Sequence, residues 1–257
     1  RIDMFKDEYQ ALCNGAVGKN NLLKKNPLGY FVSALVAGMF ISFGSFVAFT
    51  LGSFINASET AACWTKAVQA FAFASALSLV VMAGAELFTG NNLAMAAGSF
   101  RKIVSWADTV KLWVVCWVGN LIGSVLSVVM FQATGIPSGD VADYFTTIAT
   151  GKVGLEPVPL LIRAILCNIL VCLAVWCGAK LKTESGKLIM IFWCIFVFMV
   201  CGFEHSIANM SIVGVAVANG TVGIGQYFYS VLLATVGNMI GGVLFVALPY
   251  HIISKDK

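Results

Sequence analysis

Long apolar runs without charge constrain this chain more than any other feature. The run from Leu188 to Phe203 contains no Asp, Glu, Lys or Arg, and similar runs recur along the 257 residues. An apolar run of about 20 residues matches a helix that crosses the hydrocarbon core of a bilayer. Only 11% of the residues are charged, and no short alternating strands of the barrel type appear. The sequence therefore predicts an all-α integral membrane protein.

Six transmembrane helices follow from these runs, and two of them are expected to be broken. Residues 67–100 are too long for one straight span, and Glu204, His205 and Ser206 interrupt the fifth. Irregular backbone at membrane depth is tolerated only where it is buried in protein or lines a cavity. We therefore expect a half-helix, a loop and a second half-helix in spans two and five. The other spans cover about residues 28–54, 112–134, 157–179 and 227–253.

One sequence pattern occurs twice at an offset of 118 positions (Glu86 and Glu204). The same offset aligns a second pair of motifs, which indicates an internal duplication. We expect a single transmembrane channel domain, 1–257, with a first repeat at 28–134 and a second at 157–253. Matched interrupted spans in two halves point to a transport site. The aligned residues are Gly84, Glu86 and Asn91 with Gly202, Glu204 and Asn209, and Gly119-Asn120 with Gly237-Asn238.

Basic residues set the expected orientation. The N-terminal segment 1–27, the loops after spans two and four and the C-terminus hold 13 of the 16 Lys and Arg residues. The positive-inside rule makes these parts cytoplasmic, so the two repeats are inverted and their breaks meet near the midplane. Segment 1–27 is expected to lie at the membrane surface as an amphipathic helix. The net charge of +4 reflects this orientation and does not indicate nucleic acid as a partner.

The eight cysteines show no C-x-x-C spacing, and six of them lie inside apolar runs. We expect free thiols that pack as small apolar side chains. The sequence predicts no metal site and no cofactor.

Three segments resemble the motifs of the formate/nitrite transporter family. Residues 81–90 read VMAGAELFTG, residues 164–174 read AILCNILVCLA, and residues 202–210 read GFEHSIANM. The motifs follow the family's order, and the similarity covers essentially the whole chain. Within the family, the chain most resembles the hydrosulfide-channel branch.

The resemblance implies an aquaporin-like protomer of six helices and a homopentamer with one pore per protomer. It implies that His205 is the central pore histidine and that Thr89 belongs to the loop of the broken second helix. Lys152 and Asn168 match a polar pair that reaches toward the pore, and Asn238 matches a pore asparagine. The residues matching the two apolar constrictions are Phe73, Leu77, Leu87, Phe88, Val171 and Phe198. The residues expected to support the helix breaks are Glu86, Gly90, Asn91, Glu204 and Asn209. We expect the two glutamates to hold the breaks by binding neighbouring backbone.

These residues lead to a hypothesis of proton-assisted anion passage across the cell membrane. A bare ion in an apolar constriction loses hydration at a cost of several to tens of kcal/mol. The positive ends of the half-helices and a histidine that donates a hydrogen bond or shares a proton reduce this cost. We expect Lys152 to attract a small monovalent anion, which is hydrosulfide, formate or nitrite. The anion gains a proton at or near His205 and crosses as the neutral acid, while Thr89 orients the substrate or holds the imidazole.

Structural roles remain open for some of these residues. Lys152 could equally be a solvated lysine in a loop, and Asn168 could equally form a hydrogen bond between helices. The apolar constriction residues also fit ordinary packing. The sequence does not decide which anion passes, nor how passage is gated, although segment 1–27 is a candidate gate.

Three other classes of protein share parts of the pattern. Water and glycerol channels also have six spans and inverted repeats, but the proline of their Asn-Pro-Ala boxes is missing from the equivalent positions. A proton-coupled carrier would use the same histidine and broken helices, and it stays an alternative. An enzyme is not expected, because Ser206 beside His205 cannot form a nucleophile–base pair on one helix face.

Overall fold

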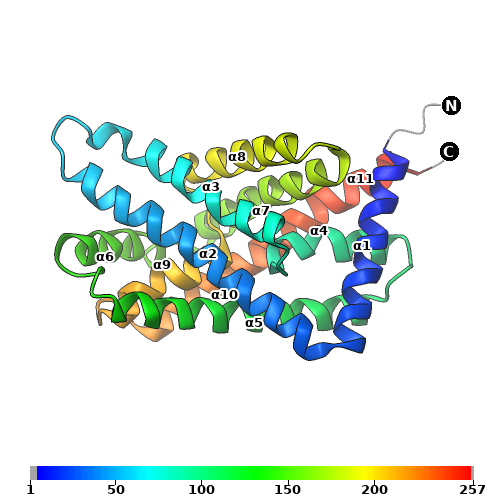
Figure 1. Ribbon diagram of the computed structural model, residues 1–257, viewed down its shortest axis with the longest axis horizontal. Helices are drawn as coiled ribbons and strands as arrows, with labels where there is room; N and C mark the ends of the chain where they lie inside the picture. Colours follow the sequence, from blue (N-terminus) through cyan, green and yellow to red (C-terminus); the bar gives the residue numbers. More distant parts are fainter. Residues whose placement is uncertain (1–4, 256–257) are drawn as a thin grey trace.

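The computed structural model describes residues 5–255, which form a bundle of helices running mainly along its long axis (Figure 1). Within this part of the chain, six helical segments are long and apolar enough to cross a membrane. This confirms the all-α membrane fold. The six segments are α2 (Pro27–Asn56), a 3-10 turn with α3 (Ala62–Ala83), α5 (Trp106–Ala133), α7 (Pro157–Lys180), α8 (Glu184–Cys201), and α10 with its continuation α11 (Ile224–Ile253).

Four further α-helices complete the described chain. Helix α4 (Phe88–Phe100) follows α3, and α9 (Ser206–Ala218) follows α8, so spans two and five are each divided into two helices. Helix α1 (Lys6–Lys25) crosses the end of the bundle where both termini lie, and α6 (Gly139–Val153) lies at the opposite end (Figure 1). We call these the proximal and the distal end.

The two breaks have the same backbone geometry. Helix α3 ends at Ala83, and Gly84 then adopts the left-handed conformation with φ of 77°. Helix α8 ends in the same way before Gly202, with φ of 71°. The first break was expected at Gly90, but Gly90 lies inside the first turn of α4. Gly84 ends the helix instead, because only glycine adopts a left-handed conformation without steric cost.

Replacing Gly84 with alanine should destabilise the protein by about 1–2 kcal/mol, the cost of a left-handed residue with a Cβ. No atom lies within 4 Å of the added Cβ, so the cost comes from the backbone alone. Gly178→Ala is the matched control, because its Cβ is equally unobstructed and its φ is not positive. Thermal unfolding in detergent measures both variants. Equal unfolding temperatures for the two would contradict the proposed role of Gly84.

Close packing of backbones also repeats in the two halves. Helix α2 packs on α5, and α7 packs on α10. A Cβ on Gly123 would overlap the carbonyl oxygen of Leu35, and a Cβ on Gly241 would overlap that of Ile165. Small residues in membrane helices allow such close approach. Glycine at both positions therefore brings each pair of spans together.

Helix α1 buries one face against the proximal end of the bundle. Tyr9, Leu12, Cys13 and Ala16 lie on this buried face, and the helix packs against α2, α4 and α7. Burial raises the pKa of the Cys13 thiol to about 11. All eight cysteines are free thiols.

Candidate functional site

Two cavities approach the helix breaks from opposite ends of the molecule. The distal vestibule has a volume of about 250 Å³ and is lined by the whole second break, residues 202–205, together with Phe198. The proximal vestibule has a volume of about 460 Å³ and is lined by the whole first break, residues 84–87, together with Leu77. Each inverted repeat thus contributes its break to one vestibule.

Thr89 and His205 join the two halves between these vestibules. Thr89 Oγ1 lies 3.1 Å from His205 Nε2, and the side chains are 0% and 3% exposed. His205 is also the N-cap of α9, since its Nδ1 accepts a hydrogen bond of 3.0 Å from the backbone N–H of Ala208.

The N-cap decides which nitrogen of the imidazole carries the proton. Because Nδ1 of His205 accepts from Ala208, the neutral ring carries its proton on Nε2, facing Thr89. Thr89 Oγ1 then accepts that hydrogen bond, and its own hydroxyl proton is left for another acceptor. A second proton on Nδ1 would break the N-cap. The site is therefore neutral, and the Thr89 hydroxyl is its free donor.

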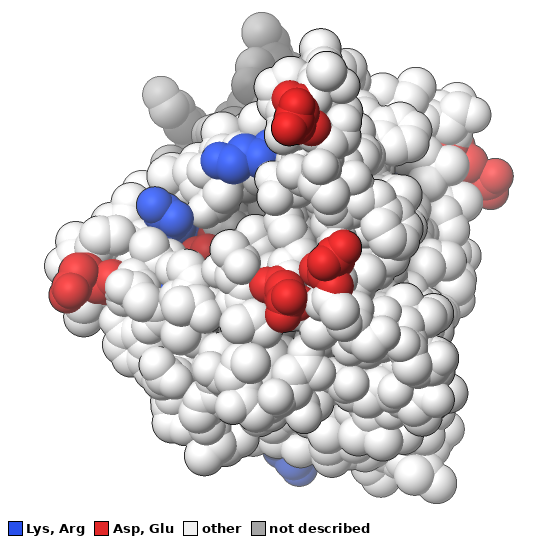
Figure 2. Space-filling model, turned by 90° about the vertical axis from the view of Figure 1, so that its left-hand side faces the viewer, with Lys and Arg blue, Asp and Glu red and all other residues white. Residues whose placement is uncertain are grey.

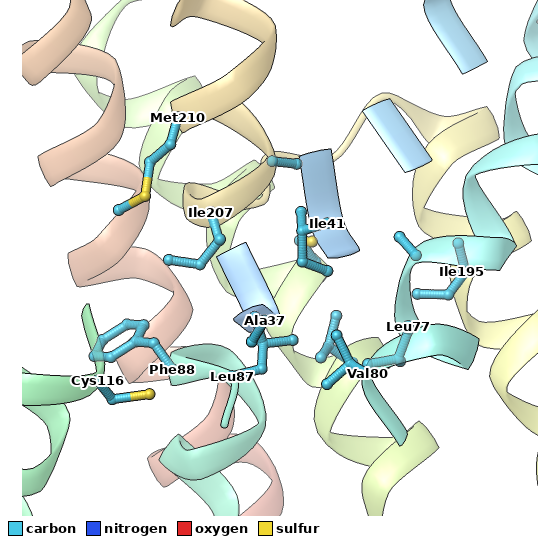
Figure 3. Packing of buried hydrophobic residues seen from close by; sticks show 14 of the residues in the cluster. Ala37, Ile41, Leu77, Val80, Leu87, Phe88, Cys116, Ile195, Ile207 and Met210 are labelled. Atoms are coloured by element: carbon cyan, nitrogen blue, oxygen red, sulfur yellow. The ribbon is translucent and has the colours of Figure 1, made fainter. Parts of the chain in front are cut away.

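Apolar side chains enclose this pair on both sides. The Phe198 ring is nearly parallel to the imidazole of His205, at 15° and 6.0 Å between centroids. Phe73 meets Phe198 edge-on at 5.9 Å. One helical turn further along α3, Leu77 lines the proximal vestibule with Leu87 and Val80, and Figure 3 shows Val80 between the two leucines. Leu77 and Leu87 therefore close the proximal vestibule before it reaches the pair, whereas the distal vestibule reaches His205 beside Phe198.

One of the expected constriction residues lies elsewhere. Phe88 lines an apolar groove between α5 and α10 together with Trp113 and Trp117, and Figure 3 shows it beside Cys116, away from Leu77. The reason is that Phe88 follows Leu87 by one residue at the start of a helix, so their side chains point in different directions. Val171 is buried in α7 and, like Phe73, lines neither vestibule, so its expected place at a constriction stays a prediction.

The carboxylate of Glu204 binds side chains, although we expected it to bind backbone. Lys152 Nζ lies 3.0 and 2.9 Å from its two oxygens, and Asn209 Nδ2 donates to Oε2 at 2.7 Å. Glu204 is 3% exposed. Lys152 therefore lines the distal vestibule as a paired cation, and it is not a solvated loop lysine.

The first half contains the same arrangement. Lys19 of α1 forms an ion pair with Glu86, and Asn91 Nδ2 donates to Glu86 Oε2 at 2.8 Å. Lys19 lines the proximal vestibule. Sequence reasoning missed Lys19 because no local pattern links it to a glutamate 67 positions away.

Asn238 holds the second break by its backbone. Its Oδ1 accepts from the N–H of Ser206 at 2.8 Å, and its Nδ2 donates to the carbonyl oxygens of Glu204 and Ala164 at 3.0 and 2.8 Å. Both amide protons are thus engaged, so none remains for an anion. The expected pore asparagine is a clamp on the helix break.

Asn120 clamps the first break in the same way. Its Oδ1 accepts from the N–H of Phe88 at 2.9 Å, and its Nδ2 donates to the carbonyl oxygens of Glu86 and Ala34 at 3.0 and 2.7 Å. The duplicated Gly-Asn motif therefore corresponds to a duplicated contact. The shared sequence offset of 118 positions is the feature that pointed to this equivalence.

Asn168 connects helices in the interior. Its Nδ2 lies 3.2 Å from the Thr89 carbonyl, 3.1 Å from Asn92 Oδ1 and 2.7 Å from the Asn238 carbonyl. It lies apart from the Lys152–Glu204 ion pair, so the structure does not bring the expected polar pair of Lys152 and Asn168 together. Asn168 instead supports the backbone that carries Thr89.

Comparison with known proteins identifies the family. The family model described as formate/nitrite transporter matches residues 6–252. This chain belongs to the formate/nitrite transporter family. The chain is also similar to the nitrite transporter NirC of Escherichia coli (strain K12), with 33% identity over 96% of this chain and 91% of the relative. It is 37% identical to a probable formate transporter of Methanothermobacter thermautotrophicus, over 89% of this chain and 90% of the relative.

Solved structures of the same family share the fold. A structure described as an FNT family ion channel has a TM-score of 0.89 and 29% identity, covering 96% of this chain and 98% of that one. A pentameric formate channel with formate bound has a TM-score of 0.77 and 29% identity, covering 90% and 98%. The family resemblance seen in the motifs is thereby confirmed. The protein is a multi-pass membrane transporter and not an enzyme.

Proposed function

We propose that this protein is a channel for small monovalent anions of weak acids, with hydrosulfide favoured and formate and nitrite as the other candidates. It acts as a homopentamer with one pathway per protomer, in the cell membrane, with both termini cytoplasmic. The names of the relatives include a nitrite transporter and a formate transporter, and one solved neighbour is a pentameric formate channel. The observation that carries the proposal is the Thr89–His205 pair between two apolar constrictions.

The constrictions exclude ions that stay charged. Phe73 and Phe198 on one side, and Leu77 and Leu87 on the other, offer no hydrogen bonds to replace hydration. Moving an unpaired charge into such surroundings costs several kcal/mol or more. The conjugate acid of a weak-acid anion carries no charge and avoids most of this cost. A pathway of this kind therefore favours anions that readily take up a proton.

The proton reaches the anion at the Thr89–His205 pair. The N-terminal ends of α4 and α9 contribute roughly half a positive charge each and attract the anion, since Lys152 and Lys19 are each paired with a glutamate. The hydroxyl of Thr89, whose oxygen accepts from the Nε2–H of His205, donates a hydrogen bond to the anion. The anion gains a proton at or near His205, crosses as the neutral acid, and releases the proton on the far side.

Hydrosulfide is favoured because the chain most resembles the hydrosulfide-channel branch. Its charge lies on a single heavy atom, and its conjugate acid is small and weakly hydrated. Formate and nitrite are larger and need more hydrogen bonds when they lose water. The narrow apolar surroundings of the central pair therefore suit hydrosulfide best.

Flux into proteoliposomes tests the proposal with hydrosulfide, formate, nitrite, chloride and glycerol. We expect the three weak-acid anions to pass faster as the pH falls, because more neutral acid forms at the central pair. Chloride should pass poorly, since its conjugate acid is strong. Passage of glycerol without any of the anions would make the protein a neutral-solute channel. Concentrative uptake driven by a pH gradient, with saturation at low substrate, would make it a proton-coupled carrier.

A further inference from the structure

The two vestibules arise from one duplicated unit but carry different charges. In the proximal vestibule the lining charges are Lys19 and Glu86, which neutralise each other as an ion pair. The distal vestibule is lined by one carboxylate, Glu204, and by three basic side chains, Lys66, Lys152 and Arg163. Glu204 accounts for only one of these three cations, because it is bound to Lys152.

Lys66 and Arg163 have unoccupied donors. Among residues 5–255, neither side chain forms a hydrogen bond or an ion pair. Lys66 lies in the first turn of α3 and Arg163 in the second turn of α7. Both side chains are exposed, and both face the same cavity. Figure 2 looks onto this end of the molecule and shows both basic and acidic side chains there.

Among the described residues, Glu204 is the only acidic side chain that lines this cavity. The four carboxylates of the distal loops line neither vestibule. A cleft with basic side chains and low-dielectric walls concentrates the electric field and raises the local concentration of anions. Lys66 and Arg163 therefore bring two positive charges to the distal vestibule that no carboxylate lining it compensates. The four carboxylates are those of Glu59, Asp140, Asp143 and Glu156.

We propose that Lys66 and Arg163, together with Lys152, bind a doubly charged oxyanion such as sulfate or thiosulfate in the distal vestibule. The planar guanidinium of Arg163 donates to two oxygens at once, and Lys66 supplies a second charge. A dianion matches two uncompensated cations better than a monoanion does. The cavity volume of about 250 Å³ is ample for one such ion.

The bound dianion blocks the pathway and does not cross it. Taking up one proton leaves a dianion still charged, so the apolar constriction of Phe73 and Phe198 continues to exclude it. While it occupies the distal vestibule, it excludes the monovalent substrate from His205, which lines the same cavity. The inference rests on the proposed function for the blocking effect, but the binding of the dianion does not depend on it.

The test measures formate flux in proteoliposomes with sulfate added to one end of the protein, at constant ionic strength set with chloride. A membrane-impermeant maleimide at the exposed Cys63, before α3 at the distal end, reports the orientation in a separate sample. We expect sulfate to inhibit from the distal end and not from the proximal end. If chloride alone inhibited the flux, or if sulfate inhibited equally from both ends, charge screening would explain the effect. Either result would overturn the proposal.

Variants locate the site. In a Lys66→Gln/Arg163→Gln double variant, the sulfate concentration for half-inhibition should rise about tenfold, as expected for the loss of two exposed charge contacts. Lys111→Gln is the matched control, because Lys111 is an exposed lysine that lines neither vestibule. Arg163→Lys keeps the charge and should retain most of the inhibition. Unchanged inhibition in the double variant would overturn the proposal.

Calorimetry separates this inference from the proposed function. Sulfate titrated into the purified full-length protein should bind to the wild type and to Lys111→Gln, and far more weakly to the double variant. This result would support the dianion site even if none of the weak-acid anions crossed the membrane. Equal sulfate binding by all three proteins would refute the site even if the flux assays confirmed the channel.

Discussion

Replacing His205 with asparagine should lower the flux of weak-acid anions by about a hundredfold, the lower end of what a positioned proton-transfer group contributes. Asparagine is a good N-cap, so its Oδ1 replaces Nδ1 as acceptor for the N–H of Ala208. It can still donate to Thr89 but cannot exchange a proton near neutral pH. The remaining flux should therefore lose its dependence on pH. Proteoliposome flux over a range of pH measures both effects.

The only other histidine provides the control. His251 lies in α11 at the proximal end, where its ring stacks on Phe100, and it lines neither vestibule. His251→Asn should leave both the flux and its pH dependence close to those of the wild type. If His205→Asn kept the wild-type pH profile, proton handling would have to lie elsewhere. The account of the Thr89–His205 pair would then be wrong.

Replacing Asn238 with alanine should destabilise the protein by about 3 kcal/mol or more, since each unsatisfied buried polar group costs roughly 1–3 kcal/mol. The substitution leaves three backbone groups without a partner, namely the N–H of Ser206 and the carbonyl oxygens of Glu204 and Ala164. Membrane depth offers little water to replace these bonds. Thermal unfolding in detergent measures the loss.

Asn120 and Asn219 make this test specific. Asn120→Ala should lose a similar amount, because Asn120 makes the equivalent three bonds in the first half. Asn219 lies at the distal end of α9 and accepts one partly buried hydrogen bond from Gln132. Asn219→Ala should therefore cost less than about 1 kcal/mol. A large difference between Asn238→Ala and Asn120→Ala would contradict the equivalence of the two clamps.

The helix breaks show how much of the structure a repeated sequence pattern predicts. The shared offset of 118 placed Glu86 opposite Glu204 and Asn120 opposite Asn238, and in the structure each pair makes matching contacts. The offset did not reveal what those contacts were. Asn238 was expected to face the pore and instead binds backbone, because an amide side chain serves either purpose equally well.

The first break shows where local reasoning fails. Gly90 and the asparagines beside it were expected to end the helix, and Gly84 ends it instead. Both positions carry glycine in an apolar run, so composition alone does not separate them. The choice depends on the close bonds from Asn120 to the backbone at Glu86 and Phe88. The donor and acceptor atoms of these bonds belong to a residue of α5, so a pattern of neighbouring residues does not predict them.

By itself, the sequence determined the membrane class, the six spans, the two interrupted helices and the inverted duplication. These properties depend on the length, hydropathy and spacing of residues close together in the chain. Only the tertiary structure decided that Lys19 pairs with Glu86, that Lys152 pairs with Glu204, and that Thr89 meets His205. Such partners lie between 52 and 116 positions apart. Because buried polar groups bind whichever partner the packed helices bring within reach, that choice is settled only when the helices come together.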